Sequence, residues 1–226
     1  MIKNHVFITG TDTHVGKTWV TGLIAKYLSK KNKSVITQKW IQTGSNTIDD
    51  IHEHLTIQKK SINDITPFIE KCCPYIFTLP ASPHLAAQNE NKIIDITHIK
   101  NSFYTLSSQF DHVIVEGSGG LLVPVTQDKT LTDITKELNI PTILVIDNKL
   151  GCINHSLLSI NTLKQHNIPL LGIVMTETNP TTNKTEEIIR HDNIKIIQSL
   201  GNTPLLASIP FLDKIQKRNY SLETKQ

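Results

Sequence analysis

The sequence predicts one α/β domain built on a doubly wound, mostly parallel sheet flanked by helices. Short apolar runs rich in β-branched residues alternate with long stretches of helical spacing, a pattern typical of parallel strands joined by helices. The runs VIV, ILVI and GIVM are almost continuously apolar, as expected of strands covered on both faces. The expected strands are residues 5–9, 34–37, 112–115, 142–146 and 171–175.

Length and composition limit the possible classes of protein. A chain of 226 residues lies within the range of single α/β domains, so we expect residues 1–226 to form one domain. The formal charge of +3 comes from scattered Lys and Arg, which is too diffuse to indicate nucleic-acid binding. No stretch approaches the roughly 18 apolar residues that cross a membrane, and the N-terminus lacks the features of a secretory signal. We expect a cytoplasmic protein without nucleic-acid or membrane partners.

The first expected strand leads through the segment GTDTHVGKT, residues 10–18, into a helix. Glycines let the backbone wrap around phosphates with its N–H groups pointing inward, Lys17 reaches the terminal phosphates, and the Thr18 hydroxyl can bind Mg²⁺. Five residues separate Gly10 from Gly16, one more than in the common form of this loop. A simple glycine turn before a helix is the alternative. We predict a triphosphate-binding loop, an ATP-using enzyme and a fold like that of P-loop NTPases.

The second expected strand runs on to Lys39, on the same rim as residues 10–18, with Thr43 four residues further along. In open parallel sheets, ligands bind beyond the carboxyl ends of the strands. A second ammonium beside a triphosphate could neutralise charge on a transferring phosphoryl group and on an anionic acceptor. The alternative is a surface lysine near a strand end.

Residues 48–100 have a less regular pattern, and prolines interrupt any long helix at 66–67 and 79–84. We expect loops and helices over one end of the sheet. Asp50, in preference to its neighbour Asp49, could supply a metal ligand from the start of this region. The alternative for Asp50 is an ordinary helix N-cap.

The third expected strand is followed by Glu116 and then by three glycines within four residues. Mg²⁺ prefers one or two carboxylates together with phosphate oxygens. We therefore predict that Thr18, Asp50 and Glu116 are the metal ligands. A solvated strand end is the alternative for Glu116.

The fourth expected strand runs into DNKL, residues 147–150, which is similar to the guanine-reading element of GTPases. That element requires aspartate where this chain has Leu150, so we exclude a GTPase. The segment KLGCINH, residues 149–155, leads instead into a helix expected to begin near Asn154, whose free N–H groups could bind a carboxylate. A simple loop and cap is the alternative.

The histidines and cysteines show no triad or metal-ligand spacing. His14 and His84 are the histidines we expect near a ligand, and the other eight we expect to be solvated. Cys72 and Cys73 are adjacent, which is not a disulfide framework. Cys152 we expect to be a packed apolar side chain rather than a nucleophile.

Together, GTDTHVGKT, the lysine of QKWIQTG, the segment ASPH, VEGSGG and KLGCINH occur in the order and spacing of dethiobiotin synthetases, which this chain resembles over nearly its full length. The resemblance implies a homodimer that closes a cyclic urea on 7,8-diaminononanoate with CO₂ and ATP, the penultimate step of biotin synthesis. It implies that one amine forms a carbamate, that the carbamate attacks the γ-phosphate, and that the second amine displaces phosphate.

The resemblance also implies roles for individual residues. The catalytic positions are Lys39, acting on carbamate and γ-phosphate, Lys17, and Thr13 close to the carbamate. The substrate-binding positions are Thr43, Ser118, Gly151, Cys152, Ile153 and Asn154, of which 151–154 would capture the substrate carboxylate across the dimer interface. The nucleotide-binding positions, besides the metal ligands Thr18, Asp50 and Glu116, are His14, Val15, Gly16, Lys17, Trp19, Gly117, Ser118, Gly119, Thr176, Glu177, Pro210, Phe211 and Leu212.

The chain departs from the family pattern at a few positions. Trp40 follows the catalytic lysine where proline is common, and His14 stands where some members have glutamate; neither change removes a needed group. Thr176 stands where well-known members carry an asparagine that reads adenine, and threonine cannot make a bidentate amide contact. We expect base selectivity to be weaker, or supplied by the main chain near residues 210–212. The tail after Asp213 is short and divergent.

Two other classes share the phosphate-binding loop. One is a related amide-forming ligase or a partition-type ATPase acting on another acceptor. Partition-type ATPases carry an extra lysine early in the loop, and residues 11–15 contain none. The other is a module that only senses ATP, against which the combination of Lys39, Thr43 and Glu116 argues.

Overall fold

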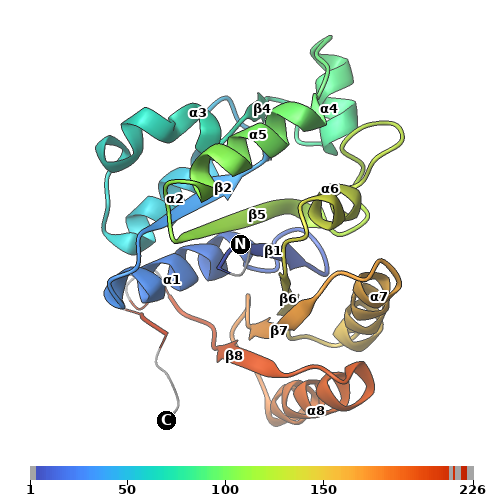
Figure 1. Ribbon diagram of the computed structural model, residues 1–226. Coiled ribbons are helices and arrows are strands. Elements are labelled where there is room, and N and C mark those ends of the chain that lie inside the picture. The colour runs from blue at the N-terminus through green and yellow to red at the C-terminus, as the bar shows by residue number, and fades with distance from the viewer. Residues whose placement is uncertain (1–3, 214–215, 217–219, 223–226) are drawn as a thin grey trace.

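The computed structural model describes residues 4–213, 216 and 220–222. Its main sheet is parallel, with the strand order β2-β5-β1-β6-β7-β8. These strands are β1 (Val6–Gly10), β2 (Val35–Lys39), β5 (His112–Gly120), β6 (Thr142–Asp147), β7 (Leu170–Thr176) and β8 (Leu205–Ile209). Each strand expected from the sequence is present, which confirms the doubly wound α/β fold (Figure 1).

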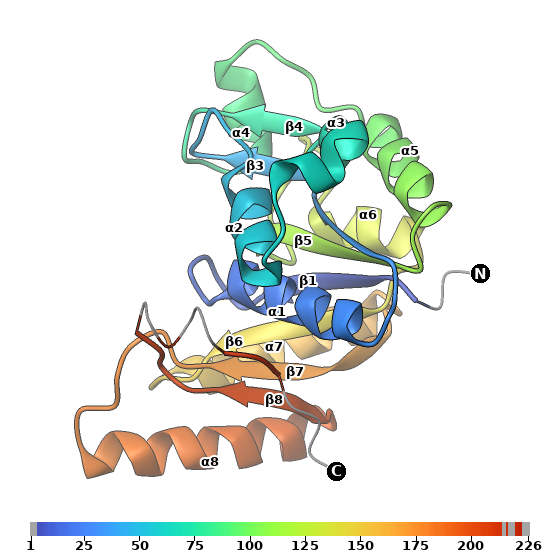
Figure 2. The same cartoon turned by 90° about the vertical axis from the view of Figure 1, so that its left-hand side faces the viewer.

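Helices cover both faces of the sheet. They are α1 (Lys17–Lys30), α2 (Asp49–Gln58), the 3₁₀ helix η1 (Ile62–Phe68), α3 (Ile69–Cys72), α4 (Pro83–Asn89), α5 (Ile96–Ser107), α6 (Leu131–Glu137), α7 (Cys152–Gln165) and α8 (Lys184–Gly201). Successive strand residues point to opposite faces: Ile8 packs with side chains of α1, whereas Phe7 packs in a cluster with residues of α5 and α6. Leu144 packs with α7 and α8. Figure 2 shows α1 in front of the strands and α6 and α7 behind them.

The register of β2, β5, β1 and β6 brings their carboxyl ends, which carry the polar side chains, to one rim of the sheet. Lys39 of β2 pairs with Glu116 of β5. Gly10 of β1 pairs with Gly120 of β5 on one side and with Val145 of β6 on the other. Because parallel strands end at the same edge, the phosphate-binding loop, Lys39 and Glu116 lie together, as the sequence predicts.

Two features of the fold were not expected from the sequence. A second, small parallel sheet pairs β3 (Ile41–Thr43) with β4 (Tyr75–Phe77), and strands of three residues are too short for a periodic signal. Strand β8 has the sequence LLASI and lies partly exposed at the sheet edge. In the region 48–100, Pro67 lies within the short helix η1 and Pro83 opens α4.

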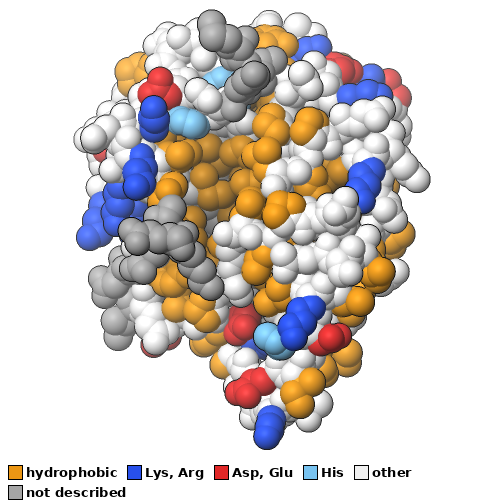
Figure 3. All heavy atoms as spheres, turned by 60° about the horizontal axis from the view of Figure 1, so that its bottom comes forward, with side chains coloured by type: hydrophobic (Ala, Val, Ile, Leu, Met, Phe, Trp, Pro, Cys, Tyr) orange, Lys and Arg blue, Asp and Glu red, His pale blue; other side chains and the backbone are white. Residues whose placement is uncertain are grey.

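Within the described ranges, no helix is long and apolar enough to cross a membrane. On the face that comes forward when the bottom of Figure 1 is turned toward the viewer, apolar side chains gather across the middle and most charged side chains of both signs lie toward the edges (Figure 3).

Candidate active site

The phosphate-binding loop, residues 10–18, joins β1 to α1 and has left-handed backbone at His14 (φ 56°) and at Gly16 (φ 91°). Glycine adopts this conformation without steric cost, which explains the residue at the N-cap of α1. The Lys17 amine donates a hydrogen bond of 2.7 Å to the carbonyl of Asp12, so the loop closes around its own lysine. The N-terminus of α1 then faces the space above the loop with backbone N–H groups suited to a phosphate.

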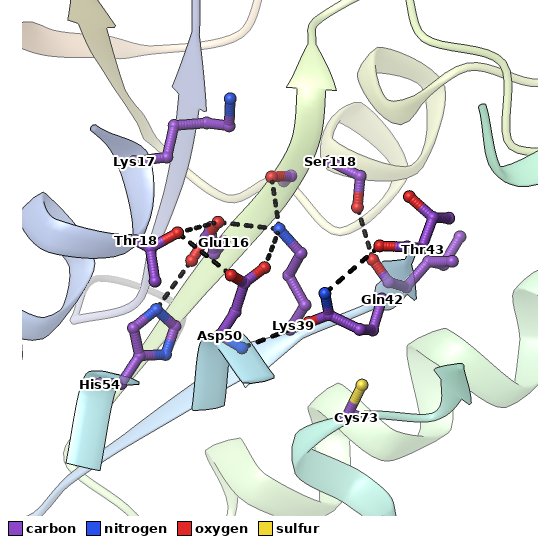
Figure 4. Close-up of polar contacts among 12 residues, drawn as sticks. Lys17, Thr18, Lys39, Gln42, Thr43, Asp50, His54, Cys73, Glu116 and Ser118 are labelled. Atoms are coloured by element: carbon purple, nitrogen blue, oxygen red, sulfur yellow. Dashed lines mark hydrogen bonds and ion pairs between the residues drawn. The ribbon is translucent and has the colours of Figure 1, made fainter. Parts of the chain in front are cut away.

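Lys39 lies at the centre of a buried ion cluster (Figure 4). Its ammonium is 2.8 Å from Asp50 Oδ2 and 2.8 Å from Glu116 Oε1, and it donates to the carbonyl of Gly117 at 3.2 Å. Lys39 is 5% exposed and Glu116 1%. A surface lysine and a solvated strand end, the alternatives for these two residues, are therefore wrong.

The three predicted metal ligands converge on the same cluster. The Thr18 hydroxyl lies 3.3 Å from Asp50 Oδ1 and 3.1 Å from Glu116 Oε1. Asp50 stands in the first turn of α2, after the N-cap residue Ile48, so the N-cap alternative is wrong. Asp49 contacts the Thr47 hydroxyl instead. Asp50 is therefore the aspartate that belongs to the cluster.

Each charged group in the cluster shifts the pKa values of its neighbours. Burial alone would lower the pKa of Lys39, but Glu116 and Asp50 raise it above its ordinary value. Burial alone would raise the pKa of Glu116, but the charge of Lys39 and a hydrogen bond from His54 bring it down to about 2. Burial and the charge of Lys39 lower the pKa of Lys17 to about 8. The site thus combines an ionised Glu116, a firmly protonated Lys39 and a Lys17 whose pKa an arriving phosphate would raise again.

Sequence reasoning missed His54, which is fully buried, with Nε2 2.7 Å from Glu116 Oε2. His5 is also buried, and its Nδ1 accepts a hydrogen bond from the Val113 N–H. The expectation that these two histidines are solvated is wrong. The spacing of Asp50 and His54, four apart and therefore on one face if the segment is helical, is the signal that could have linked them.

A cavity of about 810 Å³ opens above the cluster. Most of the predicted site residues line it: Thr13, His14, Gly16, Lys17, Thr18, Trp19, Lys39, Thr43, Asp50, Glu116, Ser118, Gly119, Thr176, Glu177, Pro210, Phe211 and Leu212. The prediction did not include several further lining residues, namely Gln42, Glu53, Pro80, Ala81, Ser82, Pro83, Val123, Thr178 and Ile209. Those at 80–83 come from the irregular region, where no periodic pattern marks them.

Other predicted residues lie outside the cavity lining. Val15 is a buried residue of the loop itself, and the carbonyl of Gly117 accepts a hydrogen bond from Lys39. A Cβ at Gly117 would lie 2.7 Å from the Phe7 ring, so glycine is needed there for packing. His84 is also absent from the lining, but its Nδ1 lies 3.0 Å from the hydroxyl of the lining residue Ser82.

The segment 151–154 is also absent from the cavity lining. Gly151 has left-handed backbone (φ 90°) and is the N-cap of α7, which begins at Cys152 rather than near the expected Asn154. Cys152 is buried, as expected of a packed side chain, and burial raises the pKa of its thiol. Asn154 is exposed.

Thr176 lies beneath the phosphate-binding loop. Its hydroxyl contacts the carbonyl of Val15 at 2.7 Å and that of Ile146 at 3.1 Å. A hydroxyl has one proton to donate, and here it is directed to the main chain of the loop and of β6. Thr176 therefore connects the loop to the sheet. Only the lone pairs of its hydroxyl oxygen remain to accept a hydrogen bond from a nucleotide base.

The donor set of the cluster fits a divalent cation. One hydroxyl and two carboxylates are hard oxygen ligands, and Mg²⁺ completes its octahedral shell with water and phosphate oxygens. Thr18, Asp50 and Glu116 would hold the ion. Lys39 neutralises the same carboxylates, so a cation bound there would share these oxygens with the ammonium or displace it.

A family model described as an AAA domain matches residues 4–219. Among curated proteins, an ATP-dependent dethiobiotin synthetase of Haemophilus influenzae is 44% identical over 75% of this chain and 88% of its own. The enzyme of that name from Halalkalibacterium halodurans is 36% identical over 93% of this chain and 86% of its own. The one from Vibrio cholerae is 33% identical over 96% and 92%.

Solved structures with the same fold include a MinC:MinD cell division complex of Aquifex aeolicus and a ParA family ATPase from Chlorobium tepidum. Each has a TM-score of 0.57 at 15% identity and covers 96% of this chain; this chain matches 85% and 88% of theirs, respectively. Identity this low shows a shared fold and nothing more about function. Because the dethiobiotin synthetases align over most of the chain at far higher identity, this protein belongs to the ATP-dependent dethiobiotin synthetase family of ligases.

Proposed function

We propose that this chain carboxylates 7,8-diaminononanoate with CO₂ and closes the product to dethiobiotin, converting ATP to ADP and phosphate in the presence of Mg²⁺. The observation that carries the proposal is the buried Lys39, held between Asp50 and Glu116 on the rim of the phosphate-binding loop. Binding of ATP alone does not require a second ammonium at that place. A reaction between an anionic acceptor and the γ-phosphate does.

In the first step one neutral substrate amine attacks CO₂, which gives a carbamate anion and releases one proton to solvent. Thr13, Thr43 and Ser118 line the cavity around the place where this group would lie. The Ser118 hydroxyl donates to the carbonyl of Ile41 at 2.5 Å, so its lone pairs remain to accept a hydrogen bond from a substrate amine. These side chains would orient the diamine toward the phosphate-binding loop.

In the second step a carbamate oxygen attacks the γ-phosphorus, ADP leaves, and a mixed carbamic–phosphoric anhydride forms. Lys39 would place its charge between the carbamate and the γ-phosphate, and Lys17 would hold the β- and γ-phosphates. When bound, Mg²⁺ would neutralise phosphate charge from the side of Thr18, Asp50 and Glu116. The raised pKa of Lys39 supports a role as a fixed positive charge rather than as a base.

In the third step the second amine attacks the carbonyl carbon of the anhydride and displaces phosphate, closing the cyclic urea. Transfer of the γ-phosphoryl group from ATP thereby turns a carbamate oxygen, which is a poor leaving group, into part of a phosphate, which is a good one. The proton released by the attacking amine passes to the departing phosphate or to solvent.

We also propose that residues 151–154 of a second copy bind the substrate carboxylate at the dimer interface. In support, this segment begins a helix of 14 residues, where free N–H groups favour an anion, and it lies outside the cavity of its own chain. A mixed dimer of a Lys39→Ala subunit and a Gly151→Glu subunit would then contain one intact site, in which the second subunit supplies Lys39 and the first supplies residues 151–154. Activity should return when the two inactive variants are mixed, and its failure to return would exclude a shared site.

The reaction is tested by incubating the purified protein with diaminononanoate, bicarbonate, Mg²⁺ and ATP and detecting dethiobiotin by mass spectrometry. Omission of each component in turn should abolish the product. If dethiobiotin does not form in the complete mixture, the proposal is wrong.

A further inference from the structure

Helix α2 presents two side chains to the ion cluster, one turn apart. Asp50 is 2.8 Å from Lys39, and His54 Nε2 is 2.7 Å from Glu116 Oε2. Figure 4 shows both side chains directed from α2 toward Glu116 on β5. The two carboxylate oxygens of Glu116 therefore have different partners: Oε2 contacts His54, while Oε1 contacts Lys39 and Thr18.

The direction of the His54 hydrogen bond follows from its surroundings. Glu116 is a carboxylate beside the Lys39 ammonium, so it accepts and His54 Nε2–H donates. His54 Nδ1 is buried and has no hydrogen-bond partner among the described residues. The contact with the carboxylate therefore places a proton on Nε2.

We propose that His54 is a positioning residue for the metal site: by occupying Glu116 Oε2, it fixes the rotamer that directs Oε1 toward Thr18 and a bound divalent cation. This inference rests on the metal site of the proposed function. It assigns no contact between His54 and substrate. Partners that hydrogen-bond a ligating carboxylate set its orientation, and their loss typically weakens metal affinity roughly 10–100-fold.

A histidine with a merely structural role is the competing explanation, because His54 is fully buried next to the core residue Leu55. Both explanations predict some loss of stability when the side chain is changed. They differ in metal affinity, which a structural role would leave intact in a protein that remains folded.

The test measures the affinity of Mn²⁺, a spectroscopic substitute for Mg²⁺, for the protein saturated with ADP, by electron paramagnetic resonance. His54→Leu removes the donor, whereas His54→Gln keeps an amide N–H near the position of Nε2. His54→Asn is polar but too short to reach Glu116. The matched control is His52→Leu on the same helix, where the side chain is exposed. Circular dichroism and ADP affinity without metal are recorded for each variant.

We expect His54→Leu and His54→Asn to weaken Mn²⁺ binding roughly tenfold or more, with ADP affinity in the absence of metal unchanged. We expect His54→Gln and His52→Leu to bind Mn²⁺ like the wild type. If His54→Leu does not fold, His54→Asn carries the test. Wild-type Mn²⁺ affinity in a folded Leu or Asn variant, or equal losses in the Gln and Leu variants, would overturn the inference.

The assay contains no diamine or bicarbonate, so its outcome is separate from that of the proposed reaction. A protein that binds Mn²⁺ as expected but forms no dethiobiotin would refute the reaction and leave the role of His54 standing. A wild-type protein that binds ADP without Mn²⁺ would refute the metal site and the role of His54 together.

Discussion

Lys39 and Glu116 are cross-strand partners in neighbouring parallel strands, and their side chains form an ion pair of 2.8 Å that is almost completely buried. The sheet register, rather than a flexible loop, fixes this contact. A buried charge is tolerated only when it is paired, so the two residues, with Asp50, form a unit from which no member can be removed without consequence.

Replacing Lys39 by Met should therefore destabilise the protein and abolish turnover. Two carboxylates would remain close together without their cation, and breaking a buried pair typically costs about 3–5 kcal/mol. Urea denaturation in metal-free buffer measures the loss. Because Mg²⁺ can replace the missing positive charge, it should stabilise Lys39→Met more than the wild type. Lys129→Met, at an exposed pair with Glu137, is the control and should have little effect.

ATP binding should be accompanied by proton uptake at Lys17. Burial and the charge of Lys39 lower its pKa to about 8, from an ordinary value of 10.5. At a pH between these values the amine is largely neutral in the free protein, and the phosphates of ATP should restore its proton. Calorimetry in buffers of different ionisation enthalpy measures the uptake. The Lys17→Arg variant, whose guanidinium is always charged, should take up fewer protons on binding ATP. A binding enthalpy for the wild type that does not depend on the buffer would refute this prediction.

Glu116 should contribute to acid sensitivity. Its pKa in the folded protein, about 2, lies below the ordinary value of 4.5. A depressed carboxyl pKa stabilises the folded state fully above the ordinary value, and the contribution is lost as the pH falls from about 4.5 toward about 2. Glu116→Gln removes the titrating group. The difference in unfolding free energy between wild type and Glu116→Gln should shrink across that window, and a difference independent of pH would contradict the assignment.

Thr176→Val should weaken ATP binding by loosening the phosphate-binding loop. The substitution keeps the shape but removes the hydroxyl that contacts the carbonyls of Val15 and Ile146. Loss of one such hydrogen bond costs about 1 kcal/mol, or roughly fivefold in affinity if it acts on the loop. Thr176→Ser retains the hydroxyl and should bind ATP like the wild type. Equal affinities for the Val and Ser variants would show that the hydroxyl does not support the loop.

Much of the fold could be predicted because its signals are local. Buried parallel strands are continuous apolar runs, and the phosphate-binding loop combines glycines with Lys17 and Thr18 in a short segment. Strands β3 and β4 could not be predicted, because three residues give no periodicity and their pairing joins segments more than thirty positions apart. The partly exposed strand β8 lacks the apolar continuity of its neighbours.

The sequence could indicate which residues gather at the rim but not how they contact one another. The preference for Asp50 over Asp49 depends on where α2 begins and how it is rotated, which are tertiary properties. The burial of His54 depends on the packing of α2 against α1 and β2, so its sequence position alone does not indicate the contact with Glu116. The contacts of the Thr176 hydroxyl with the main chain of the loop and of β6 join segments far apart in the sequence, so the sequence could not indicate them.

The central claim, that a carbamate oxygen attacks the γ-phosphate, is tested by a single-turnover reaction in ordinary water started with bicarbonate labelled with heavy oxygen. Attack by the carbamate oxygen predicts that both the urea carbonyl of dethiobiotin and the released phosphate carry the label. At ring closure one carbamate oxygen stays in the urea and the other leaves with the phosphate. The labelled carbonyl reports that the label survived exchange with water. Labelled dethiobiotin accompanied by unlabelled phosphate would contradict the account.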